Sequence, residues 1–136
     1  MKYQCEVFID ANIELVSKSY FDHDVLKKWD TGLLRVEPGE SPNQYYLYYR
    51  WGEEEMRMKE TIEEINLPNR GVVTYEVPGA WNRCVNQFFE ENGKTRFVMD
   101  VEFIFDKDPN IPIEIFKEKT LLGMNLYKKF IEKGEN

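Results

Sequence analysis

The chain has 136 residues, of which 42% are hydrophobic and 15% aromatic, so we expect a single domain over residues 1–136, ordered except for its last few residues. The formal net charge of −7 argues against nucleic acid as a partner, because phosphate binding needs a concentrated basic surface. No apolar run approaches the roughly 18 residues of a membrane span. The first residues lack the apolar stretch of a signal peptide, and two cysteines build no disulfide scaffold. We therefore expect a reduced, cytoplasmic protein without stable membrane insertion.

The N-terminal part predicts a strand followed by two short helices. Residues 2–10 alternate between apolar and polar side chains, which is typical of a half-buried strand. Asn12 can cap a helix in which apolar residues recur at i, i+3 and i+7 from Ile13. Either Asp22 or Asp24 can cap a second helical turn, whose apolar members are Val25, Leu26 and Trp29.

Regularly spaced turn signals then divide the chain into further strands. The Asn92-Gly93 pair is the clearest of them, because it supplies the positive φ angles of a type I′ hairpin turn. With the first strand, this predicts about seven antiparallel strands. The runs between the turns are roughly 33–37, 44–51, 55–65, 71–77, 81–90 and 94–105.

The last third joins a long alternating strand to an amphipathic helix over Ile113–Ile131, with Pro112 in its first turn. Gly123 lies in the middle of this helix, either through close packing, through simple tolerance, or to leave room for a ligand. We expect an α+β fold whose sheet curls around this helix and leaves a cavity between them. The apolar side of the strand carries Phe97, Met99, Val101, Phe103 and Phe105, and the expected broad face of the helix carries Ile115, Phe116, Lys119, Leu122, Leu126 and Phe130.

Several segments resemble one superfamily in their order and spacing: Val7–Val16, Lys28–Leu33, Met58–Ile65 and Val72–Val77. Asn12 departs from the pattern, since proline is common at its position. The chain is similar to the helix-grip proteins of the START/birch-pollen-allergen (SRPBCC) superfamily, in particular to the polyketide cyclase/dehydrase-like branch. The resemblance implies a deep cavity for lipids, sterols, polyketides or other hydrophobic molecules. It implies neither a shared catalytic apparatus nor a cofactor.

Glu60 is the leading candidate for chemistry, because its strand places it on the same side as the apolar residues Met56, Met58 and Ile62. A carboxylate on that side could act as a general acid or base, or bind a polar group of a ligand. Alternatively, it could reach solvent at a bulge or the end of the barrel, or pair with a neighbouring strand.

Other chemistry-bearing residues favour structural roles. His23, the only histidine, lies between two aspartates at a helix junction, so we expect a surface or capping residue. Cys5 and Cys84 lack the spacing of a metal or redox site, and we expect no metal.

Two strands leave open which side chains face the cavity. In 81–90 neither face is fully apolar, and in 44–51 tyrosines lie on both faces. The candidate ligand-binding residues are Tyr45, Leu47, Tyr49, Met56, Met58, Ile62, Tyr75, Asn82, Cys84, Asn86, Phe97, Met99, Val101, Phe103, Phe116 and Gly123.

Three functions are compatible with these features. The first is binding of a hydrophobic small molecule in a cavity of about 300 Å3 or more between helix and sheet. The second is a cyclase or dehydratase that uses Glu60 as acid or base with a tyrosine or asparagine partner. The third is a protein-interaction module, which would fill the cavity with side chains and expose an apolar patch. The oligomeric state stays open.

Overall fold

The structure, a computed structural model, describes residues 1–134, so residues 135 and 136 of the predicted domain lie outside the described residues. All predicted helices and strands are present, with only slightly shifted bounds. In chain order they are β1 (Lys2–Ile9), α1 (Ile13–Tyr20), α2 (His23–Trp29), β2 (Leu33–Pro38), β3 (Gln44–Trp51), β4 (Glu54–Asn66), β5 (Arg70–Val77), β6 (Ala80–Glu91), β7 (Lys94–Phe105) and α3 (Ile113–Glu132).

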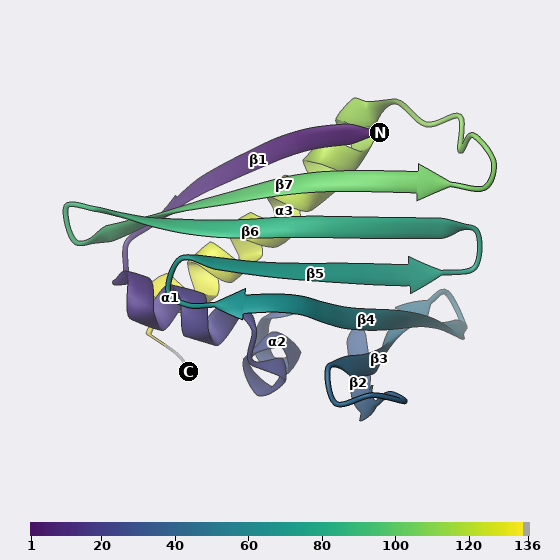
Figure 1. Ribbon diagram of the computed structural model, residues 1–136, viewed down its shortest axis with the longest axis horizontal. Coiled ribbons are helices and arrows are strands. Elements are labelled where there is room, and N and C mark those ends of the chain that lie inside the picture. Colours follow the sequence, from purple (N-terminus) through teal and green to yellow (C-terminus); the bar gives the residue numbers. More distant parts are fainter. Residues whose placement is uncertain (135–136) are drawn as a thin grey trace.

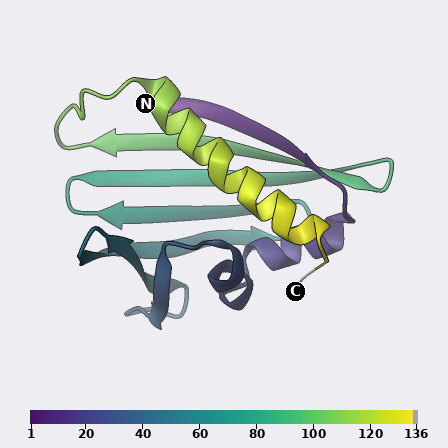
Figure 2. The same ribbon diagram turned by 180° about the vertical axis from the view of Figure 1, so that it is seen from behind.

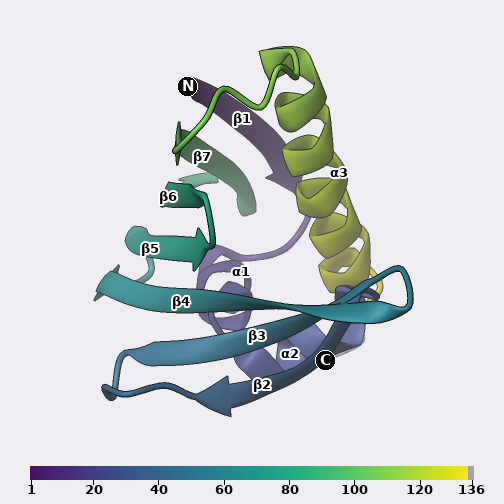
Figure 3. The ribbon, with the colours of Figure 1, turned by 90° about the vertical axis from the view of Figure 1, so that its right-hand side faces the viewer.

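The seven strands form one antiparallel sheet in the order β1-β7-β6-β5-β4-β3-β2 (Figure 1). Short turns join each pair of consecutive strands from β2 to β7. The first strand, β1, forms one edge of the sheet and pairs with the last strand, β7. At the β6–β7 hairpin, Asn92 and Gly93 have φ angles of 55° and 80°, as the type I′ prediction requires. The sheet is strongly curved, and its concave side faces α3 (Figure 3).

The long helix α3 crosses the concave side of the sheet diagonally and packs on β1, which confirms the predicted helix-grip fold (Figure 2). Its Tyr127 is fully buried and donates a hydrogen bond of 2.6 Å to the Val16 carbonyl of α1. Around this contact lies the core, in which Phe88 and Phe97 stack at 4.8 Å between ring centroids. The N-terminal helices and α3 therefore close one end of the curved sheet together.

The predicted apolar face of α3 is wrong in part. The side chains of Ile115, Leu122 and Leu126 are exposed, Leu122 by 63%, although their spacing is helical. The helix instead buries Met124, Tyr127 and Ile131. Apolar residues lie on several sides of α3 itself, so their spacing alone did not identify which side packs on the aromatic core.

Local capping signals define where the two short helices begin. The Asn12 side chain accepts a hydrogen bond from the Leu15 amide, and Asp22 caps α2 by accepting from the Asp24 amide. Asp22, one of the two predicted caps, is thus the one used. Pro112 precedes α3 as its N-cap residue rather than lying within the first turn.

A glycine lets the end of α1 approach the sheet closely. A Cβ atom on Gly71 of β5 would lie 2.3 Å from the ring of Phe21, so a larger residue there would displace this ring. Gly123 has no such role, because a Cβ atom there would meet nothing within 4 Å. Close packing therefore does not explain Gly123. In the part of the chain that the structure describes, no helix is both long and apolar enough to span a membrane.

Candidate functional site

A cavity of about 380 Å3 lies between the helices and the concave side of the sheet. Strands β3 to β6 form its floor, the end of α1 and the whole of α2 form one wall, and α3 contributes from above. Its lining combines apolar side chains with an unusual number of polar ones. The lining residues are Tyr20, Phe21, His23, Leu26, Trp29, Asp30, Leu47, Tyr49, Met58, Glu60, Ile62, Val73, Tyr75, Asn82, Lys119 and Thr120.

The structure brings together seven of the residues singled out from the sequence: Leu47, Tyr49, Met58, Glu60, Ile62, Tyr75 and Asn82. It also resolves the two strand faces that were left open. On β3 the set with Leu47 and Tyr49 faces inward, whereas Tyr46 and Tyr48 lie on the outer face, where Arg57 and Arg35 cover their rings. On β6 the inward set is the one that contains Asn82.

The other ten candidate residues do not line this cavity. Phe97, Met99 and Val101 belong to the closed core, which also contains Met124 and Tyr127 of α3. Phe103 and Phe116 pack against each other at 5.2 Å between ring centroids. Cys84 and Asn86 are buried in the sheet, Tyr45 packs on the ring of His23, and Met56 and Gly123 lie outside the lining.

Most lining residues that the sequence did not point to come from the helices. They are Tyr20, Phe21, His23, Leu26, Trp29, Asp30, Lys119 and Thr120, with Val73 added from β5. A strand pattern divides side chains between two faces, but the position of a short helix over a sheet depends on contacts distant in sequence. One local signal existed: His23, Leu26 and Asp30 recur at i, i+3 and i+7, which places them on one helical face.

His23 and Glu60 form a polar pair in the cavity wall, in which Glu60 is buried and His23 is partly exposed. The Nε2 atom of His23 lies 2.6 Å from the Oε1 atom of Glu60, and Glu60 is only 5% exposed. The expectation that His23 is a surface or capping residue is therefore wrong. Its pair with the carboxylate joins the first residue of α2 to the middle of β4.

A second polar contact holds the other end of α2. The hydroxyl of Tyr49 donates a hydrogen bond of 3.0 Å to Oδ2 of Asp30, the residue that follows the helix. Burial raises the pKa of the Asp30 carboxyl, against the opposing effect of the hydrogen bonds from Tyr49 and Gly32. The short helix is thus joined to the sheet by one side-chain contact at each end.

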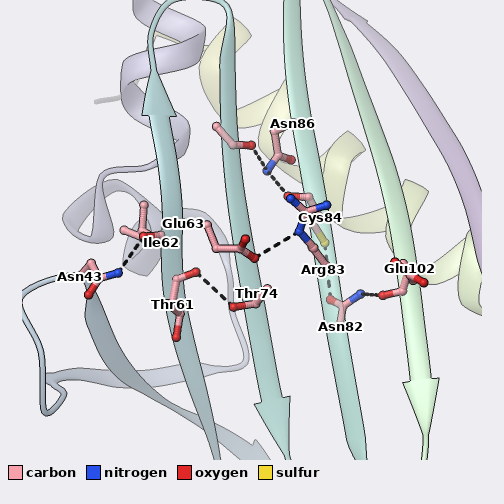
Figure 4. Close-up of polar contacts among 11 residues, drawn as sticks. Asn43, Thr61, Ile62, Glu63, Thr74, Asn82, Arg83, Cys84, Asn86 and Glu102 are labelled. Carbon is pink, nitrogen blue, oxygen red and sulfur yellow. Dashed lines mark hydrogen bonds and ion pairs between the residues drawn. The ribbon is translucent and has the colours of Figure 1, made fainter.

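Two amides that sequence analysis offered as ligand contacts bond to the sheet instead (Figure 4). The Asn82 amide donates to the Glu102 carbonyl at 3.0 Å, and the Asn86 amide donates to the Gly71 carbonyl at 3.2 Å. Burial raises the pKa of the Cys84 thiol to about 12, so this cysteine is a neutral core residue. Across residues 1–134 no group of three or more His, Cys, Asp or Glu side chains is arranged to hold a metal ion.

Comparison with known proteins supports the fold. No protein-family model and no curated protein matches the chain. Among solved structures, an uncharacterized protein from Rhizobium leguminosarum matches with a TM-score of 0.82 and 16% identity over 98% of this chain and 95% of that one. A conserved protein from Geobacillus kaustophilus matches with a TM-score of 0.79 and 15% identity, over 98% and 94%.

A further match is Ara h 8.0201, a Bet v 1-like allergen, with a TM-score of 0.79 and 10% identity over 96% of this chain and 97% of that one. Identities this low establish a shared helix-grip fold of the birch-pollen-allergen type and nothing about activity.

Proposed function

We propose that residues 1–136 form one helix-grip domain of the SRPBCC superfamily, in its polyketide cyclase/dehydrase-like branch, which binds a small hydrophobic molecule in the cytoplasm. The observation that carries this proposal is the cavity of about 380 Å3 beneath α3. Cavities of roughly 300–1,000 Å3 are typical of small-molecule sites, in which apolar walls provide affinity and a few polar groups orient the ligand. An open cavity is also the opposite of the filled interior expected for a protein-interaction module.

Fluorescence titration with N-phenyl-1-naphthylamine tests the proposal, because this apolar dye fluoresces strongly only when it is withdrawn from water. We expect saturable binding at one site per chain, with a dissociation constant on the order of micromolar. A linear, unsaturable signal, or no signal at all, would contradict a binding cavity.

A second candidate function, a cyclase or dehydratase, is favoured by one specific observation. The Glu60 carboxylate lines the cavity and is held at 2.6 Å by His23. A carboxylate that is held in place in a cavity can remove a proton from the carbon next to a ligand carbonyl. A neighbouring tyrosine would then donate a hydrogen bond to the carbonyl oxygen. The proton taken up by Glu60 would pass to the hydroxyl group on the β-carbon, which leaves as water while the α,β double bond forms.

We expect Glu60→Gln to slow dehydration of a β-hydroxyketone such as 4-hydroxy-4-phenylbutan-2-one at least about 100-fold, the usual effect of losing a general base. The conjugated product absorbs in the ultraviolet, so the rate is read directly. Binding of N-phenyl-1-naphthylamine should persist in this variant. Equal turnover by both proteins, or no turnover above the buffer rate, would remove the enzyme from consideration and leave the binder.

A further inference from the structure

Two tyrosine hydroxyls in the cavity lack partners within the described part of the chain. Tyr20 and Tyr75 both line the cavity, and neither hydroxyl makes a hydrogen bond to any of residues 1–134. The third lining tyrosine, Tyr49, differs, since its hydroxyl donates to Asp30. A hydroxyl that lines a cavity and has no protein partner is a position at which a ligand can supply a hydrogen bond.

Each acceptor side chain of the cavity already has a hydrogen-bonding partner within the protein. The Glu60 carboxylate bonds His23, and the Asp30 carboxylate accepts from Tyr49. The hydroxyl of Thr120 shares a hydrogen bond of 2.8 Å with Tyr3. The free hydrogen-bonding capacity inside the cavity therefore consists mainly of donors, which are the two phenols, the buried Nε1 of Trp29 and the ammonium group of Lys119.

Both phenols stay protonated, so both are donors. Burial raises the pKa of Tyr20 and of Tyr75 well above the ordinary value for tyrosine. The charge of Glu60 raises both pKa values further. Glu60 and Tyr75 are also direct partners across β4 and β5, where facing side chains lie about 5 Å apart.

We propose that Tyr20 and Tyr75 donate hydrogen bonds to a neutral carbonyl oxygen on an otherwise apolar ligand. This inference rests on the proposed binding function and adds the chemical class of the ligand. A carbonyl fits better than a carboxylate, because Glu60 faces Tyr75 directly and would repel a second negative charge. A hydrocarbon would leave both hydroxyls unsatisfied.

Two naphthalene dyes of similar size separate the carbonyl contact from burial. Prodan (6-propionyl-2-dimethylaminonaphthalene) carries a ketone whose emission shifts to the red when its oxygen accepts a hydrogen bond, and N-phenyl-1-naphthylamine has no carbonyl. The variants are Tyr20→Phe, Tyr75→Phe and the double variant, each of which removes only an oxygen atom. Tyr48→Phe is the matched control, since Tyr48 lies on the outer face of the sheet beneath Arg35.

For each single cavity variant we expect the dissociation constant of Prodan to rise about 5- to 15-fold, the usual effect of losing one hydrogen bond, and for the double variant we expect a larger rise. Its bound emission should shift to the blue. The constant for N-phenyl-1-naphthylamine should stay within about twofold, and Tyr48→Phe should change neither dye.

Unchanged Prodan affinity in the double variant, or equal weakening of both dyes, would overturn the carbonyl assignment while leaving the binding function intact. The same holds if the wild-type protein binds N-phenyl-1-naphthylamine but not Prodan. If it binds neither dye, the binding function and the carbonyl assignment both fail.

Discussion

Met58→Trp is expected to weaken binding of N-phenyl-1-naphthylamine on the order of 100-fold. Met58 is half-buried on β4 and its side chain lines the cavity, so an indole ring at this position occupies space that the ligand needs. Displacing about 100 Å2 of apolar ligand contact costs roughly 2.5 kcal/mol at 25 cal/mol per Å2, which corresponds to this loss of affinity. Fluorescence titration of both proteins measures it.

The matched control is Leu122→Trp, which adds the same ring to the exposed side of α3. This variant should bind the dye as the wild type does. Because the cavity can accept the new side chain, Met58→Trp should also unfold at a urea concentration close to that of the wild type. Equal affinity of Met58→Trp and wild type would show that the dye binds elsewhere.

His23→Leu is expected to destabilise the protein by about 3 kcal/mol, because removing one partner of a buried pair leaves the other charge without compensation. The remaining partner here is Glu60, which is 5% exposed and has its closest polar contact with His23. Urea unfolding at pH 7 gives the free energy directly. The helix α2 should also become more mobile, since its hydrogen bond to Glu60 of β4 is lost.

The double variant His23→Leu/Glu60→Leu separates this cause from simple loss of packing. Replacing both members of a buried pair by apolar residues is often neutral, so the double variant should recover most of the lost stability. Additive destabilisation by the two substitutions, or a cost below about 1 kcal/mol for His23→Leu alone, would refute a coupled buried pair.

Local sequence signals predicted the elements of this fold well. Alternation defined the strands, Asn12 and Asp22 set the starts of the short helices, and Asn92-Gly93 fixed the last hairpin. Each of these signals acts within a few residues, so a single sequence is enough to interpret it. The buried face of α3 was harder, because its exposed leucines share the spacing of its buried residues.

The candidate site was predicted only where it lies on strands. Glu60 was identified because alternation placed a carboxylate among methionines, and the structure does bury it. Its contact with His23 spans 37 residues of sequence and depends on where α2 rests on the sheet. The apolar side chains from Phe97 to Phe105 were expected to form a wall of the cavity, and they do not line it. No local sequence signal indicates that α3 packs on β1 rather than on β5.

Methyl NMR of protein labelled with 13C at its methionine methyl groups tests the central claim most directly. Of the methionines, Met58 lines the cavity, Met99 and Met124 lie in the closed core, and Met1 is exposed at the N-terminus. Titration with N-phenyl-1-naphthylamine should shift the Met58 resonance most and leave that of Met1 unchanged. A Met58 resonance that stays fixed while the dye binds would contradict a ligand site in this cavity.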